Sequence, residues 1–65
     1  MTNKEISENL GKIVNYKGEQ HILNAYTLRM INGQRIRQCE IQDNSNTNSV
    51  MIVKADDLTV DNNNK

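Results

Sequence analysis

The chain has 65 residues, with eight basic and eight acidic side chains that give no net charge at pH 7. A chain of this length forms one domain with a small core, because it buries only about 60% of the surface that its unfolded form exposes. The zero net charge argues against broad electrostatic capture of nucleic acid, and no apolar run approaches the ~20 residues of a membrane span.

A short helix is predicted near the start of the chain. Thr2 is a cap-type residue, and Glu5 follows it by three positions, which is the spacing of a capping box. Ile6 and Leu10 lie four residues apart, so they share one helical face and are expected to pack on the rest of the domain. We therefore expect a helix over Asn3–Asn9.

Two strands joined by a tight turn follow the helix. Residues 12–16, KIVNY, are rich in β-branched and aromatic side chains and predict the first strand. A turn over residues 17–19 leads to a long second strand over residues 20–31, along which apolar residues mostly alternate. Leu23 and Ala25 are out of phase with this alternation. Such a strand, apolar on both faces near its start, is typical of one that bends and serves two sheets of a small barrel.

Asn32 and Gly33 favour a two-residue turn of type I′, because both positions tolerate a positive φ. This turn sets the register of a hairpin. The predicted opposed pairs are Ile31–Gln34, Met30–Arg35, Arg29–Ile36, Leu28–Arg37, Tyr26–Cys39 and Asn24–Ile41. Ile36 then lies on the face opposite to Cys39, and a bulge at residues 37–38 would correct its phase.

Short elements complete the chain. Residues 43–49, DNSNTNS, predict a polar loop whose side chains hydrogen-bond to the local backbone. Residues 50–55, VMIVKA, are apolar on both faces, as a central strand would be. We expect a single 3-10 turn over residues 56–58, a last strand over residues 59–61 and a disordered tail over residues 62–65.

The order of these elements resembles the Src-homology-3-like small barrels, which have five short strands and a 3-10 turn before the last. Residues 11–22, GKIVNYKGEQHI, are similar to the opening of that barrel class, and residues 53–58, VKADDL, to its fourth strand and turn. The resemblance covers residues 11–61. It implies a mostly β fold with a five-stranded barrel over residues 12–61, which follows the short helical segment predicted above for residues 1–11. The chain has no tryptophan or phenylalanine, which argues against polyproline recognition.

The sequence gives little support to catalytic or metal chemistry. Cys39 falls mid-strand among apolar residues, where cysteine is usually inert, and His21 follows a turn, where we expect it at a solvent-exposed strand edge. One cysteine and one histidine supply neither an intramolecular disulfide nor four metal ligands. Asp56 and Asp57 suit a capped turn better than an acid/base pair, and residues 43–47 lack the glycine and glutamate of a calcium loop. We expect no enzyme activity and no cofactor.

All three arginines lie around the Asn-Gly turn, and three interpretations of them remain open. They can be charges that discourage edge pairing of a hairpin, contacts to a protein partner, or contacts to the phosphates of a nucleic acid. Tyr26 falls in phase with Leu28 and Met30, which favours a place in the core, although a tyrosine could stack on a base. The candidate binding residues are Arg29, Arg35, Arg37, Tyr16, Lys17 and Lys54.

The sequence therefore predicts a small binding module, first of all a protein-interaction adaptor or inhibitor. The alternative is a nucleic-acid-binding accessory protein with a basic sheet face, since residues 12–37 hold five basic residues against one acidic residue. The lone cysteine and a first segment without an apolar stretch indicate a cytoplasmic protein. Eleven asparagines, a residue with AT-rich codons, point to a microbial, phage or mobile-element source. Apolar strands in so small a domain leave a homodimer open.

Overall fold

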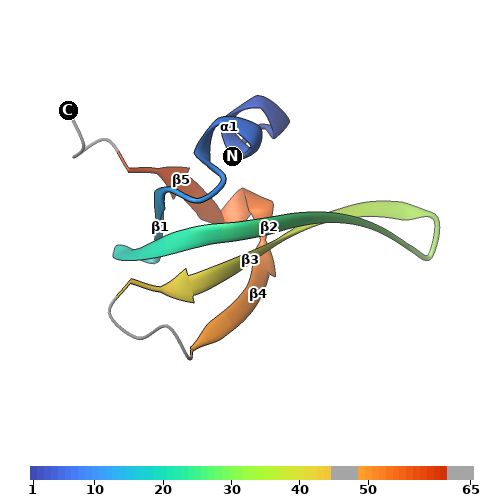
Figure 1. Ribbon diagram of the computed structural model, residues 1–65. Coiled ribbons are helices and arrows are strands. Elements are labelled where there is room, and N and C mark those ends of the chain that lie inside the picture. The colour runs from blue at the N-terminus through green and yellow to red at the C-terminus, as the bar shows by residue number, and fades with distance from the viewer. Residues whose placement is uncertain (45–48, 62–65) are drawn as a thin grey trace.

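The computed structural model of the chain describes residues 1–44 and 49–61. The polar loop expected over residues 43–49 lies partly outside the described residues, and the tail expected over residues 62–65 lies wholly outside them. The described chain forms a helix, five strands and a 3-10 turn (Figure 1). These elements are α1 (Asn3–Asn9), β1 (Ile13–Tyr16), β2 (Glu19–Ile31), β3 (Gln34–Asp43), β4 (Val50–Lys54), η1 (Ala55–Asp57) and β5 (Leu58–Val60). The mostly β fold is confirmed.

The five strands form one antiparallel sheet in the order β4-β3-β2-β1-β5. Strands β1 to β4 follow one another as a meander, and β5 returns to pair with β1. Closure into a barrel would require a hydrogen-bonded ladder between β4 and β5. These two strands are instead the edges of the sheet in the described part of the chain, so the sheet is open.

The core lies between one face of the sheet and the segments α1 and η1, and α1 crosses above this face in Figure 1. The Met1 side chain packs against this core, and its ammonium group donates to the carbonyl oxygens of Ala55 at 2.9 Å and Leu58 at 3.2 Å. These bonds tie the first residue to η1 and β5. The buried apolar residues are Ile6, Val14, Leu23, Cys39, Ile41, Val53, Ala55 and Leu58.

The predicted capping box is present at the start of α1. The Glu5 amide donates to Thr2 Oγ1 at 3.1 Å, and the Thr2 amide donates to Glu5 Oε1 at 2.9 Å. Ile6 is buried, as predicted, but Leu10 is exposed, so the packing expected of Leu10 is wrong. The helix ends at Asn9, and the backbone of Leu10 is already extended, so its side chain no longer follows the face of Ile6.

The turn between β2 and β3 has the predicted geometry and register. Asn32 and Gly33 have φ values of 51° and 78°, in the left-handed region that a type I′ turn requires. All the pairs predicted from the turn up to the pair of Tyr26 with Cys39 are present. The Asn-Gly dipeptide at the tip thus determines which side of the sheet each side chain occupies over most of the hairpin.

Beyond that point a β-bulge shifts the register. Leu23 pairs with Ile41, and Ala25 pairs with the preceding residue of β3, so Asn24 is the extra residue. The predicted pair of Asn24 with Ile41 is therefore wrong, and so is the bulge predicted at residues 37–38. The bulge in β2 turns Leu23 onto the core face, where it is fully buried, and this explains its phase in the sequence.

Strand β4 is an edge strand, which corrects the prediction of a central one. It pairs with β3 on one side, and no described strand pairs with its other side. Val53 is its only buried side chain, whereas Val50, Met51 and Ile52 are exposed. The apolar character of Val50, Met51 and Ile52 therefore does not reflect burial within the described chain.

His21 is buried, so the prediction of a solvent-exposed position is wrong. Its side chain lies on the core face opposite Val14 of β1, and only 6% of the residue is exposed. The ring of Tyr16 meets it edge-on, with 6.0 Å between the ring centroids. Neither ring nitrogen of His21 has a hydrogen-bond partner among the described residues. A buried polar group without a partner costs about 1–3 kcal/mol.

Replacing His21 by leucine should therefore stabilise the fold. Leucine has a similar size and no polar atom to satisfy, so we expect His21→Leu to raise the free energy of unfolding by about 1–2 kcal/mol. Urea denaturation at neutral pH, followed by circular dichroism, measures this change. His21→Asn keeps an unsatisfied polar group and is the matched control, for which we expect no gain. A leucine variant no more stable than the native chain would contradict this account.

Candidate binding surface

The distal part of the β2–β3 hairpin projects beyond the rest of the sheet (Figure 1). Strand β1 pairs with β2 only along residues 19–22, and β4 pairs with β3 only along residues 38–42. Residues 27–37 therefore form a two-stranded ribbon with no further described strand on either side. We call this ribbon the arm.

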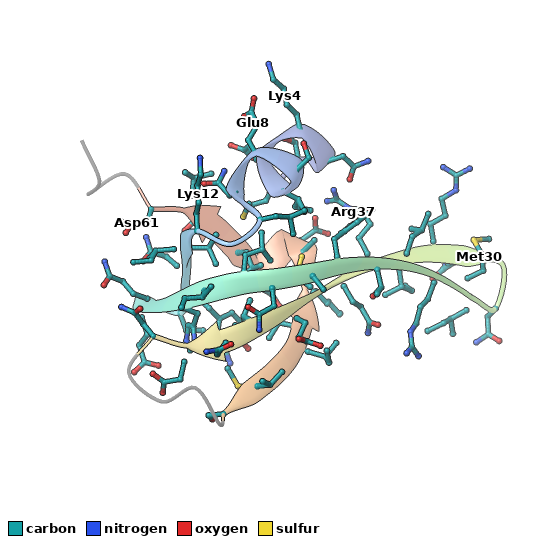
Figure 2. All side chains as sticks on the ribbon, viewed as in Figure 1. Lys4, Glu8, Lys12, Met30, Arg37 and Asp61 are labelled. Atoms are coloured by element: carbon teal, nitrogen blue, oxygen red, sulfur yellow. The ribbon has the colours of Figure 1, made fainter. Side chains whose placement is uncertain are left out.

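The arm is both basic and apolar. It contains all three arginines of the chain and no acidic residue. Leu28, Met30 and Ile31 are exposed along it, and Met30, near the tip, is 63% exposed (Figure 2). Several exposed apolar side chains gathered on one projection are typical of an interaction site.

The arginines of the arm do not share one face. Arg35 pairs with Met30 and Arg37 pairs with Leu28, and these side chains continue the core face of the sheet. Arg29 is one residue out of phase, so it lies on the opposite face. This division agrees with the predicted register. The basic sheet face considered in the alternative, nucleic-acid-binding interpretation is thus split between the two sides of the ribbon.

Arg37 holds the base of the arm to α1 and η1. Its guanidinium group forms an ion pair with Asp56, with 2.6 Å between Nη2 and Oδ1, and donates to Asn3 Oδ1 at 2.9 Å. The Tyr26 hydroxyl donates to the same Asn3 oxygen at 3.4 Å. Figure 2 shows Arg37 directed toward α1. One of the three arginine charges is therefore partnered within the fold.

Three of the predicted binding residues meet at the base of the arm. Arg35, Arg37 and Lys54 line a shallow depression together with Ile36 and Asp56. Asp56 neutralises Arg37, so the remaining positive charge comes from Arg35 and Lys54, which form no ion pair with a described residue. This arrangement suits an anionic group, such as a carboxylate, presented by a ligand.

The other predicted residues, Tyr16 and Lys17, lie at the β1–β2 turn, next to the end of β2 that is farther from the arm. Lys17 is in the β1–β2 turn, with its Nζ 5.3 Å from the centroid of the Tyr16 ring. Tyr16 packs against the core, and so does Tyr26, in agreement with the prediction for Tyr26. The arm thus carries arginines but no aromatic ring on which a base could stack.

Cys39 and His21 do not form a catalytic pair. Cys39 is fully buried opposite Tyr26, whereas His21 lies opposite Asp43, four residues further along β3. The rise of a strand separates these positions by about 13 Å. Burial raises the pKa of the Cys39 thiol, and the charges of the N-terminal ammonium group and Arg37 act in the opposite direction. No group of three or more metal-ligating side chains occurs among the residues that the structure describes.

Comparison of the chain with protein-family models, with curated proteins and with solved structures finds no match. Within the described ranges, no helix has the length and apolar character needed to cross a membrane. The interpretation of the arm and its basic depression therefore rests on their geometry.

Replacing Arg37 by glutamine should loosen the base of the arm. The change removes the ion pair with Asp56, whose side chain is 81% exposed, so we expect a modest loss of about 0.5–1 kcal/mol at low salt. Thermal denaturation at low and high salt measures the loss, which should shrink as salt rises. Arg29→Gln removes the same charge at a position without an ion pair or side-chain hydrogen bond to a described residue, and should leave Tm almost unchanged. Equal effects of the two variants would contradict the role assigned to Arg37.

The Cys39 thiol should be unreactive in the folded protein. Its burial excludes reagents, and its raised pKa reduces the thiolate fraction on which the reaction depends. We expect an aromatic disulfide reagent to modify Cys39 at least about a hundredfold more slowly in the native chain than in denaturant. Rapid modification of the native chain, followed by absorbance, would show that the core around β3 is open.

Proposed function

We propose that the protein is a non-enzymatic protein-binding module, an adaptor or inhibitor, that contacts its partner through the arm and the depression at its base. The observation that carries the proposal is the exposed apolar arm beside Arg35 and Lys54, two cations that form no ion pair with any described residue. Apolar side chains combined with arginine are enriched in protein interfaces. Such a surface suits a partner segment with both apolar and acidic side chains.

The proposal extends to the fold class and to the setting of the protein. The four-stranded meander, the 3-10 turn and a last strand beside β1 support a relationship to the Src-homology-3-like barrels. The single buried cysteine supports a reducing cytoplasm. The asparagine-rich composition supports a microbial, phage or mobile-element origin.

Nucleic-acid binding is the second candidate function, because a two-stranded ribbon with arginines fits the major groove of DNA. Two observations make it the weaker one. Arg37 is paired with Asp56, and Arg29 and Arg35 lie on opposite faces of the arm. The arm therefore presents few free charges to a phosphate backbone, whose neutralisation supplies most of the affinity in such complexes.

Selection from a displayed random-peptide library, followed by fluorescence anisotropy of the selected peptides, tests the proposal. We expect peptides that combine apolar and acidic residues. Met30→Ser together with Arg35→Gln should weaken their binding at least about tenfold, which corresponds to the loss of about 1.4 kcal/mol. Lys17→Gln removes a charge at the far end of β2 and is the control, for which binding should persist.

Labelled DNA and RNA oligonucleotides, measured at low and physiological salt, distinguish the two candidate functions. The proposal predicts no oligonucleotide binding at physiological salt. Salt-sensitive oligonucleotide binding that Arg35→Gln abolishes, together with failure to select any peptide, would overturn protein binding in favour of the second candidate.

A further inference from the structure

Strand β4 presents an apolar edge that nothing in the described chain covers. Val50, Met51 and Ile52 are exposed, and the single charge of the strand, Lys54, stands at its last position. No described strand pairs with the outer side of β4, so its outward backbone groups form no ladder with another described strand. Edge strands of soluble proteins are usually protected by a charge, a proline or a bulge, and residues 50–53 contain none of these.

The core face is incomplete at this edge. Val53 is buried on that face opposite Cys39 of β3. Met51 lies on the same face opposite Ile41, yet it is 40% exposed because the sheet ends beside it. Ile52 lies on the outer face and is 58% exposed. An added strand would therefore cover apolar side chains on both faces.

We propose that β4 pairs antiparallel with β4 of a second copy of the chain, about a two-fold axis at Ile52. In this register Met51 lies opposite Val53 of the second copy, so the apolar row of the core face continues across the junction. Lys54 lies opposite Val50, so no like charges face each other. The strand is thus complementary to itself, which an isologous two-fold interface requires.

The observations favour this pairing over a junction of β4 with β5. Strand β5 has three residues, Leu58–Val60, so it can align with only part of the five-residue β4. A β4–β5 junction would also be heterologous, and it would propagate into a ring or a filament. The pairing of β4 with itself uses the whole strand and closes after two copies.

The junction is small. One five-residue strand covers less than the roughly 800 Å² per partner of a standard protein interface. We therefore expect a weak dimer with a dissociation constant of roughly tens to hundreds of micromolar. The junction does not include the arm and shares only Lys54 with the proposed binding surface. It therefore goes beyond the proposed function, and substitutions at Ile52 test it separately.

Analytical ultracentrifugation of the full chain from about 5 µM to about 1 mM tests the proposal. We expect a reversible monomer–dimer equilibrium. Ile52→Lys places two ammonium groups at the axis and should raise the dissociation constant at least about tenfold, without unfolding, because the side chain is exposed. Ile31→Lys makes the same change on the arm and should leave the equilibrium unaltered. Circular dichroism of both variants verifies that they are folded.

Disulfide formation between two copies tests whether the two-fold axis lies at Ile52. Residues that face each other across an antiparallel pair are close enough for a disulfide. Ile52→Cys should therefore form a covalent dimer with oxidised glutathione, much faster than the control Ile31→Cys. A monomer at every concentration, or a dimer that Ile52→Lys leaves intact, would overturn the proposal. Species larger than a dimer that Ile52→Lys abolishes would overturn the two-fold pairing in favour of the β4–β5 junction.

Discussion

The ladder between β2 and β3 is the constraint on which the rest of the structure depends. The Asn32-Gly33 turn fixes it at one end, and the bulge at Asn24 adjusts it near the other. Because side chains alternate along a strand, a slip of one residue would carry Cys39 and Ile41 from the core to the solvent. Strands β2 and β3 are longer than their outer neighbours β1 and β4. Their distal ends therefore extend beyond the sheet and form the arm.

The base of the arm is where the fold and the candidate binding surface meet. A two-stranded ribbon alone is at best marginally stable in water. Arg37 and Tyr26 both contact Asn3 of α1, and Arg37 also holds Asp56 of η1, so the ribbon is anchored on the covered side of the sheet. In the proposed complex, an anchored arm would need less ordering on binding, and this would leave more of the contact energy for affinity. The hydrogen bonds and ion pair of Arg37 therefore hold the arm in place. Arg35 forms no ion pair with a described residue and is the arginine that we propose contacts a partner.

The sequence could predict the features that depend on neighbouring residues, such as the capping box and the register next to the Asn-Gly turn. It could not place the bulge at Asn24, because an extra residue at several positions restores an alternating pattern equally well. The burial of His21 depends on a strand across the sheet, which a local pattern does not contain. The make-up of the candidate site could not be predicted for the same reason. Lys54 lies beside Arg35 and Arg37 only because of the register between β3 and β4, which the local sequence does not contain. An apolar strand, likewise, looks the same in sequence whether its neighbour belongs to its own chain or to another.

In the two proposals, the open edge and the arm act as separate surfaces, one for self-association and the other for a partner. In the proposed dimer, antiparallel pairing of the β4 strands reverses one copy relative to the other. Each arm extends past the Lys54 end of its β4 strand, so the two arms would leave the joined sheet in opposite directions. An arm of about ten residues offers only a small contact area to a partner. Two arms held on one rigid sheet raise the apparent affinity for a partner with two sites, because the second contact forms at a high effective concentration. Weak self-association at β4 would in this way compensate for the small size of each arm.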